Sequence, residues 1–221
     1  MTDGESPLLA PDEPPSVTVE RPDGSSPYLL TCDHAGNRIP RRLGTLGLRG
    51  PDLEGHVAWD IGAAGVARRL SERLDATLVL QTYSRLVIDC NRPLDSPDSI
   101  AITSEDTEIP GNRNLDPVAA EARAREIFHA YHDRIAAALD ARQASGQPSL
   151  LVAVHSFAPV YKGVRRPWHV GILYGRDGRL AGTLLELLAG EGDLCIGDNE
   201  PYSVDDESDY TIPTHGERRG I

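Results

Sequence analysis

Residues 28–34, YLLTCDH, are the stretch that decides the fold. A short apolar run between Pro27 and a polar Asp-His pair predicts a buried strand, because a strand covered on both faces needs no polar alternation. The run SLLVAV at 149–154 has the same character and leads directly into His155. Each predicted strand therefore ends at a histidine, and in an open α/β sheet the functional side chains gather at the carboxyl ends of the strands.

The rest of the chain alternates between helix and strand patterns. The helical spacing of Ile61, Val66, Leu70 and Leu74 predicts a helix within residues 57–74. The alternation of such segments is typical of the α/β class.

A second, longer helix is predicted from Asp116 to Gly146. Asp116-Pro117 has the chemistry of a helix start, and apolar residues at positions 127, 131, 135 and 139 continue one stripe. Further strands are predicted at 76–80, 85–90, 170–174 and 194–196, and a further helix at 180–188.

Length and composition predict one domain with an N-terminal arm. A chain of 221 residues can form a single core. Residues 1–26 are rich in proline and acids and bury too little apolar surface to offset the entropy of ordering. We therefore expect a flexible arm at 1–26 and one domain at 27–221.

The charge of the chain disfavours two classes of partner. A formal net charge of −12 and a pI near 5.0 repel phosphate backbones and anionic lipid surfaces, and no long basic patch offsets this repulsion. The apolar runs are shorter than the ~18 residues of a membrane span, and the start lacks a secretory signal. Three irregularly spaced cysteines fit a reducing compartment. We expect a cytoplasmic protein that binds neither nucleic acid nor membrane; the sequence does not indicate its oligomeric state.

His34 and His155 are the candidate metal ligands. Two imidazoles brought together in a cleft are common nitrogen donors for Zn²⁺, and a catalytic zinc needs a third ligand and an open position. Asn37 offers an amide oxygen for this third place, and Asp60 and Asp33 are anionic alternatives.

A cysteine nucleophile is a weaker alternative to the metal. Cys32 and Cys90 both lie in apolar runs, where burial raises the pKa of a thiol and lowers its reactivity.

Arginines near the predicted strand ends are candidates for binding a small anion. Asn91-Arg92 follows the predicted strand 85–90, and a guanidinium there can hold a carboxylate with two hydrogen bonds or pair with a neighbouring Asp. Arg85 and the Arg165-Arg166 pair leave the same two possibilities open. Glu217 is the best candidate for carrying a proton near a metal.

Five separated motifs together resemble the N-formylglutamate amidohydrolase family. They are CDHAGN at 32–37, HVAWDIGA at 56–63, SRLVIDCNRP at 84–93, VHSF at 154–157 and HGERRG at 215–220. The resemblance runs from about residue 28 to the end. It implies a fold related to zinc carboxypeptidases and aspartoacylase, with three layers: a mixed, mostly parallel sheet between helices and a metal at the strand ends.

The resemblance also implies an activity and site residues. The expected activity is removal of an N-formyl or other small N-acyl group from glutamate or a similar acidic amino acid, as in histidine degradation, with Zn²⁺ or another divalent metal. The relatives have a His-x-x-Glu ligand motif, whereas Asn37 stands at the fourth position here, so Asp60 stays a rival. Their Asp-x-Asn-Arg motif implies that Arg92 binds the substrate carboxylate.

The family continues past the HGERRG motif into a strand with a catalytic glutamate, and this chain ends before it. Three explanations follow: a shortened sequence, Glu217 serving in its place, or lost activity. The last leaves a non-catalytic module that binds metal or amino acid as the alternative function.

Overall fold

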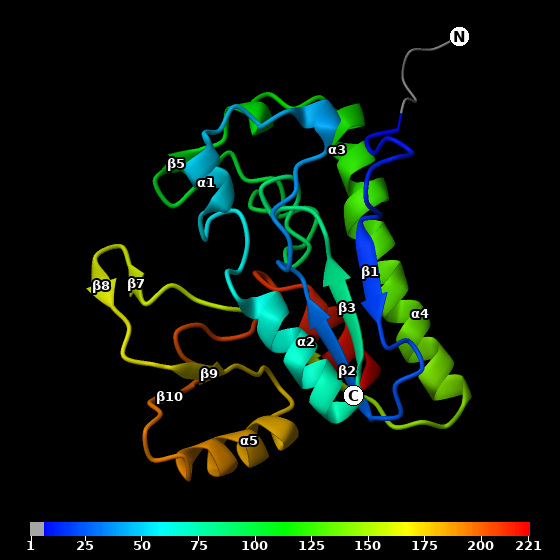
Figure 1. Cartoon of the computed structure of the whole chain (residues 1–221), viewed down its shortest axis with the longest axis vertical. Coiled ribbons are helices and arrows are strands. Elements are labelled where there is room, and N and C mark those ends of the chain that lie inside the picture. The colour runs from blue at the N-terminus through cyan, green and yellow to red at the C-terminus, as the bar shows by residue number, and fades with distance from the viewer. Residues whose placement is uncertain (1–6) are drawn as a thin grey trace.

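A computed structural model describes residues 7–221 and has a four-stranded sheet at its centre (Figure 1). The strand order is β1-β3-β2-β6; β2 pairs in parallel with β3 and β6, while β1 runs antiparallel to β3. These strands are β1 Val17–Glu20, β2 Tyr28–Cys32, β3 Thr77–Gln81 and β6 Leu150–Ala153. The predicted α/β class and the strands at 28–32, 76–80 and 149–154 are confirmed, with ends shifted by a residue or so.

Helices cover both faces of this sheet, and successive residues of β2 point to opposite sides. Leu29 belongs to a core cluster with Ile127 and Ile135, from the helical segment that ends in α4 (Ala130–Ala144). Leu30 belongs to a second cluster with Ala63 and Ala67 of α2 (Ala63–Leu74). Both faces of β2 are therefore apolar, which explains its continuous apolar run.

The long helix predicted from Asp116 is confirmed. It comprises α3 (Pro117–Arg123), a π-helical segment (Ala124–His129) and α4. Asp116 caps it, because its carboxylate accepts a hydrogen bond from the Val118 backbone N–H at 2.8 Å. All four predicted stripe positions are buried: Ile127, Tyr131, Ile135 and Leu139.

The helix predicted within 57–74 begins later, and its predicted apolar face is wrong. Gly62 has a left-handed φ of 85°, and α2 starts only after it. Ile61 and Val66 are more than half exposed, at 53% and 54%. The buried face consists of the small residues Ala63, Ala64, Ala67 and Ser71. Alanine lets the helix approach the sheet closely, and the periodicity of large apolar residues did not reveal this face.

The strand predicted at 85–90 is wrong, because this segment is a buried turn. The Ser84 hydroxyl donates to the Ala58 carbonyl at 2.7 Å and accepts from the Leu86 N–H at 3.1 Å. Leu86, Val87 and Ile88 lie in the same core cluster as Leu29. A short apolar run is thus compatible with any buried backbone, and the run alone did not distinguish strand from turn.

The flexible arm predicted at 1–26 is contradicted for its described part, while residues 1–6 lie outside the described residues. β1 pairs with β3 along four residues. Leu8 is 5% exposed, and its backbone N–H donates to Glu126 at 3.0 Å. The segment is thus ordered by residues distant in the sequence, in β3 and at Glu126, and its proline-rich, acidic composition does not reveal these contacts.

The remaining elements lie around and beyond the sheet. β9 (Val170–Ile172) and β10 (Ile196–Asp198) form a separate parallel pair beside α5 (Arg179–Ala189). The strand predicted at 170–174 and the helix predicted at 180–188 are confirmed with shifted ends, whereas the strand predicted at 194–196 lies two residues later in the chain. None of the described helices is long and apolar enough to cross a membrane. The elements are α1 Gly50–Glu54, β4 Thr103–Ser104, β5 Thr107–Glu108, β7 Val160–Tyr161, β8 Val164–Arg165, β9 Val170–Ile172, α5 Arg179–Ala189 and β10 Ile196–Asp198, with short 3-10 turns at Arg41–Leu43, Pro110–Asn112 and Glu217–Arg219 and a π turn at Ile212–Gly216.

Candidate metal centre

Three side chains meet at the carboxyl ends of the central strands. His34 follows β2, His155 follows β6, and Asp60 lies in the loop before α2, where its backbone N–H donates to the His34 carbonyl at 3.0 Å. One ligand atom from each of the three lies within 4.8 Å of the others. Two imidazoles and a carboxylate are a ligand set typical of catalytic zinc, which keeps a further position open. The arrangement of parallel strands thus brings the two predicted histidines together.

His34 offers its Nδ1 atom to this group. Its Nε2 lies 2.7 Å from Oδ1 of Asp89, so a proton at Nε2 leaves the lone pair at Nδ1. That Nδ1 is buried, lies 3.5 Å from Oδ2 of Asp60, and has no hydrogen-bond partner within residues 7–221. Burial is the main cause that lowers the pKa of His34 to about 4, so the ring is neutral at pH 7. A neutral buried nitrogen without a partner is the form that a metal ligand takes.

His155 is held in a similar way by a second carboxylate. Its Nε2 lies 3.0 Å from Oδ2 of Asp33, and its Nδ1 lies 2.9 Å from Oδ2 of Asp60. The same Asp60 oxygen accepts a hydrogen bond from the Ser156 backbone N–H at 3.2 Å. Both histidines therefore carry a carboxylate on Nε2, the arrangement that fixes the tautomer of metal-binding imidazoles.

The two supporting carboxylates are buried and remain ionised. Burial alone would raise the pKa of each. For Asp33, the hydrogen bond and charge of His155 outweigh burial and hold the pKa below its ordinary value. For Asp89, the charge that His34 carries when it is protonated, its hydrogen bond, and the charges of Arg85 and Arg92 have the same effect on the pKa.

Arg85 lies on the far side of Asp60. Its guanidinium donates a hydrogen bond to Oδ1 of Asp60, the oxygen that does not face the histidines. Arg85 therefore balances the charge of the candidate ligand. Its predicted role as a clamp for substrate stays a prediction.

The structure favours Asp60 over Asn37 as the third ligand. The Asn37 side-chain amide donates to the Leu53 carbonyl at 3.1 Å. Asp60, by contrast, contacts both histidines.

Glu217 lies in another hydrogen-bonded group. Its carboxylate accepts from the backbone N–H of Arg176 at 2.5 Å and from its guanidinium at 2.8 Å. Glu217 is not one of the three candidate ligands, which are His34, Asp60 and His155. Its role as proton carrier stays a prediction.

The other predicted substrate residues occupy two different places. Asn91 binds the segment 209–211, and Arg92 donates to the Ser208 carbonyl and lies 3.6 Å from Asp209. Arg165 is exposed in the β7–β8 hairpin. The roles of Asn91, Arg92 and Arg165 toward a substrate stay predictions.

Sequence analysis did not predict which residues support the histidines, although it gave Asp33 as an alternative metal ligand. Asp89 and Asp33 each stand next to a predicted site residue or in the same motif, and this adjacency was the available signal. Thr211, whose hydroxyl donates to Oδ1 of Asp33 at 2.9 Å, had no such signal, because 178 residues separate the two.

The cysteine alternative is disfavoured. Burial raises the pKa of Cys32 to about 12 and raises that of Cys90 well above the ordinary value. Neither thiol therefore supplies a thiolate near neutral pH.

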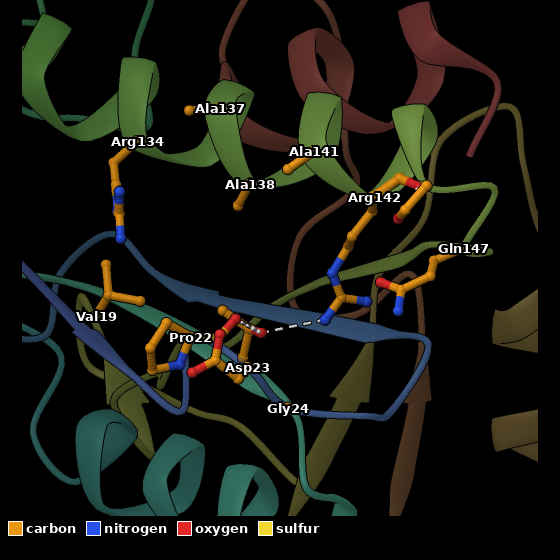
Figure 2. Close-up of a pocket in the computed structure, with 12 residues that line it drawn as sticks. Val19, Pro22, Asp23, Gly24, Arg134, Ala137, Ala138, Ala141, Arg142 and Gln147 are labelled. Atoms are coloured by element: carbon orange, nitrogen blue, oxygen red, sulfur yellow. Dashed lines mark hydrogen bonds between the residues drawn. The ribbon is translucent and has the colours of Figure 1, made fainter.

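A hollow of about 440 Å³ lies away from this group, between α4 and the turn after β1 (Figure 2). Arg134 and Arg142 project into it from α4, and Pro22 and Asp23 line the opposite wall. Arg142 donates to Thr77 Oγ1 at 3.1 Å and to the Ser26 carbonyl at 2.9 Å. It thus ties α4 to the sheet, and none of the candidate ligands lines this hollow.

The fold and the three-residue group define an α/β protein with a candidate divalent-metal centre at its strand ends. The model of the N-formylglutamate amidohydrolase family matches residues 26–221, and the chain belongs to this family. It is accordingly a hydrolase that acts on amide bonds, and the resemblance found in its motifs is confirmed.

Two solved structures are similar to this chain. One is the crystal structure of gene product Atu2144 from Agrobacterium tumefaciens, with a TM-score of 0.93 and 41% identity over 97% of this chain and 84% of that chain. The other is N-formylglutamate amidohydrolase from Ralstonia eutropha JMP134, with a TM-score of 0.66 and 21% identity over 85% of this chain and 77% of that chain. The second likeness concerns the fold alone. A search of the curated proteins finds no match.

Proposed function

We propose that this protein is a metal-dependent amidohydrolase that removes an N-formyl or similarly small N-acyl group from glutamate or a related acidic amino acid. Family membership supports the reaction class. One observation supports the metal: Nδ1 of His34 is buried without a hydrogen-bond partner in the described chain and faces Asp60. A buried polar atom left in this state is unfavourable by about 1–3 kcal/mol unless a ligand satisfies it.

The ligands would be Nδ1 of His34, Oδ2 of Asp60 and Nδ1 of His155, and zinc is the metal that this donor set suits best. When bound, zinc supplies Lewis-acid activation of water and of the amide carbonyl. Asp89 and Asp33 keep the protons on the outer nitrogens of the two rings, so that both inner lone pairs stay available. We also propose that the fold is related to that of the zinc carboxypeptidases.

Cationic side chains near the centre suit an acidic substrate. Arg92 has a 33% exposed side chain and follows Asp89 and Asn91, so we propose that it holds a substrate carboxylate at the rim of the site. Arg85, whose guanidinium pairs with Oδ1 of Asp60, would add further positive charge near the site. Arg165, in the exposed β7–β8 hairpin, is a further proposed contact for the substrate. Asn91 is proposed to contribute through the 209–211 segment, which it binds.

Glu217 is proposed as the group that takes up and returns the proton. The side chain of its partner Arg176 is 67% exposed, whereas that of Glu217 is 8% exposed, so this role requires the Glu217 carboxylate to leave its ion pair with Arg176.

The test is formate release from N-formyl-L-glutamate by protein stripped of metal, with and without added Zn²⁺. We expect turnover only with zinc and its loss, by at least about a hundredfold, in His34→Ala, since this variant removes one of three ligands. Zinc-independent turnover would contradict the metal mechanism, and tight zinc binding without release would point to a different acyl group.

A matched pair of variants tests the third ligand. Asp60→Asn should weaken zinc binding and turnover together, whereas Asn37→Ala should retain both, because the Asn37 amide bonds to Leu53 instead. The reverse pattern would assign Asn37 to the metal.

A further inference from the structure

Asp33, behind His155, has both of its carboxylate oxygens engaged. Oδ2 accepts a hydrogen bond from Nε2 of His155 at 3.0 Å, and Oδ1 accepts from the Thr211 hydroxyl at 2.9 Å. Asp33 is 1% exposed and Thr211 is 0% exposed. Bulk water does not reach this pair, so the hydrogen bond from the Thr211 hydroxyl helps to fix the second oxygen of the carboxylate, and the buried Tyr131 hydroxyl lies near the same carboxylate.

Thr211 is in turn held by Asn91. Oδ1 of Asn91 accepts from the backbone N–H of Thr211 at 3.0 Å and of Tyr210 at 3.2 Å, and its Nδ2 donates to Asp209 at 2.9 Å. Three hydrogen bonds thus set the position of the segment that carries the hydroxyl. The contacts of Asn91 are those of a structural anchor for 209–211.

The same turn supports the other histidine. Oδ1 of Asp89 accepts from Nε2 of His34 at 2.7 Å and from the backbone N–H of Asn91 at 2.8 Å. Residues 89–91 therefore reach His34 directly through Asp89. They reach His155 indirectly, through Asn91, Thr211 and Asp33.

We propose that Thr211 is a positioning residue of the metal centre, whose hydroxyl orients Asp33 so that His155 keeps its proton at Nε2 and presents Nδ1 to a metal. This inference rests on the proposed function, because it takes His155 to be a ligand. Without the Thr211 hydroxyl, Oδ1 of Asp33 loses this hydrogen bond, and the carboxylate can rotate away from the plane of the His155 ring.

The first test is the Zn²⁺ affinity of Thr211→Val and Thr211→Ser, measured by competition with a chelating dye. We expect Thr211→Val to bind about tenfold more weakly, the lower end of the effect of losing a supporting partner. Thr211→Ser keeps the hydroxyl and should restore the affinity. The matched control is Thr214→Val, because the Thr214 hydroxyl is buried in the same segment without a hydrogen-bond partner in the described chain. Unchanged affinity in Thr211→Val, or an equal loss in Thr214→Val, would overturn the proposal.

The second test needs no metal. The Nε2–H proton of His155 is observed by NMR in the metal-free protein, where we expect the signal of a hydrogen bond to Asp33 in the wild type and in Thr214→Val, and a shifted and broadened signal in Thr211→Val. Thr211→Ala repeats the measurement if the valine variant does not fold. If the wild type binds no zinc, the proposed function fails, and the Nε2–H signal of His155 decides the role of Thr211 separately: a signal unaffected by loss of the hydroxyl would overturn it.

Discussion

The central sheet and the unit formed by β9, β10 and α5 differ in how well their apolar side chains are covered. In β2, Leu29 and Leu30 are 0% and 1% exposed. In α5, Ala181 alone is buried, and Leu187 is 66% exposed. The candidate ligands all belong to the first region, at or beside the ends of its strands. Side chains that must hold a fixed geometry are thus carried by the most closely packed part of the molecule.

The two regions differ in how many layers of structure cover their apolar side chains. Leu29 lies between neighbouring strands and under the long helix, so folding removes it from water on every side. α5 packs against only a two-stranded sheet on one side, and its outer face stays in water. The first region should therefore supply most of the stability, and the same substitution should have different effects in the two.

The largest effect is expected for Leu29→Ala. Truncating a fully buried leucine loses its transfer free energy and leaves a cavity, so the free energy of unfolding should fall by about 2–5 kcal/mol. Urea unfolding followed by circular dichroism measures it. A loss below about 1 kcal/mol would mean that the sheet is not the closely packed region.

An effect of intermediate size is expected from pH, through three buried histidines whose pKa is lowered: His34 at the candidate metal centre and the pair of His132 and His215. Nδ1 of His132 lies 3.0 Å from Nε2 of His215, and Nε2 of His132 lies 2.8 Å from the Cys90 carbonyl. Burial is the main cause that lowers the pKa of each histidine from 6.5 to about 4. Between these values the unfolded chain binds more protons than the folded one, so stability falls as the pH falls from 6.5 towards 4.

Each of these histidines should lower the free energy of unfolding by up to about 1.4 kcal/mol per pH unit within that window. The measurement is the free energy of unfolding of the metal-free protein in urea at pH 7.5 and pH 5. These two values lie about one pH unit or more above and below the ordinary histidine pKa. His132→Gln, which lacks one of these three titrating rings, should show a shallower dependence. Equal wild-type stability at both pH values would contradict the prediction.

Sequence analysis predicted the elements whose signal is continuous in the chain. The apolar runs at 28–32 and 149–154 and the stripe of the long helix contain enough residues in one pattern to specify their structure. The turn at 85–90 has the same composition as a strand, and its hydrogen bonds, such as those of Ser84, distinguish it. The N-terminal segment is ordered by partners such as Glu126, more than a hundred residues away, so local composition did not reveal it.

At the candidate site, too, sequence analysis did not predict contacts between residues far apart in the chain. His34 and His155 were predicted because each ends a strand, and Asp60 was a rival third ligand because a carboxylate suits zinc. The hydrogen bond from Thr211 to Asp33 joins residues 178 positions apart, and it depends on how the 209–211 segment docks on Asn91. The two candidate histidines follow from local sequence here, whereas the Thr211 contact that supports His155 through Asp33 follows from tertiary packing.

The smallest effect is expected for Leu187→Ala, the same substitution made in the other region. Leu187 already contacts water in the folded state, so truncating it changes the buried apolar area little, and alanine has the highest helix propensity. The free energy of unfolding should change by no more than about 0.5 kcal/mol. The measurement is the urea unfolding used for Leu29→Ala, with zinc affinity determined on the same samples. If Leu187→Ala lost as much stability as Leu29→Ala, the outer face of α5 would be covered in solution, and the contrast between the two regions would not describe the protein.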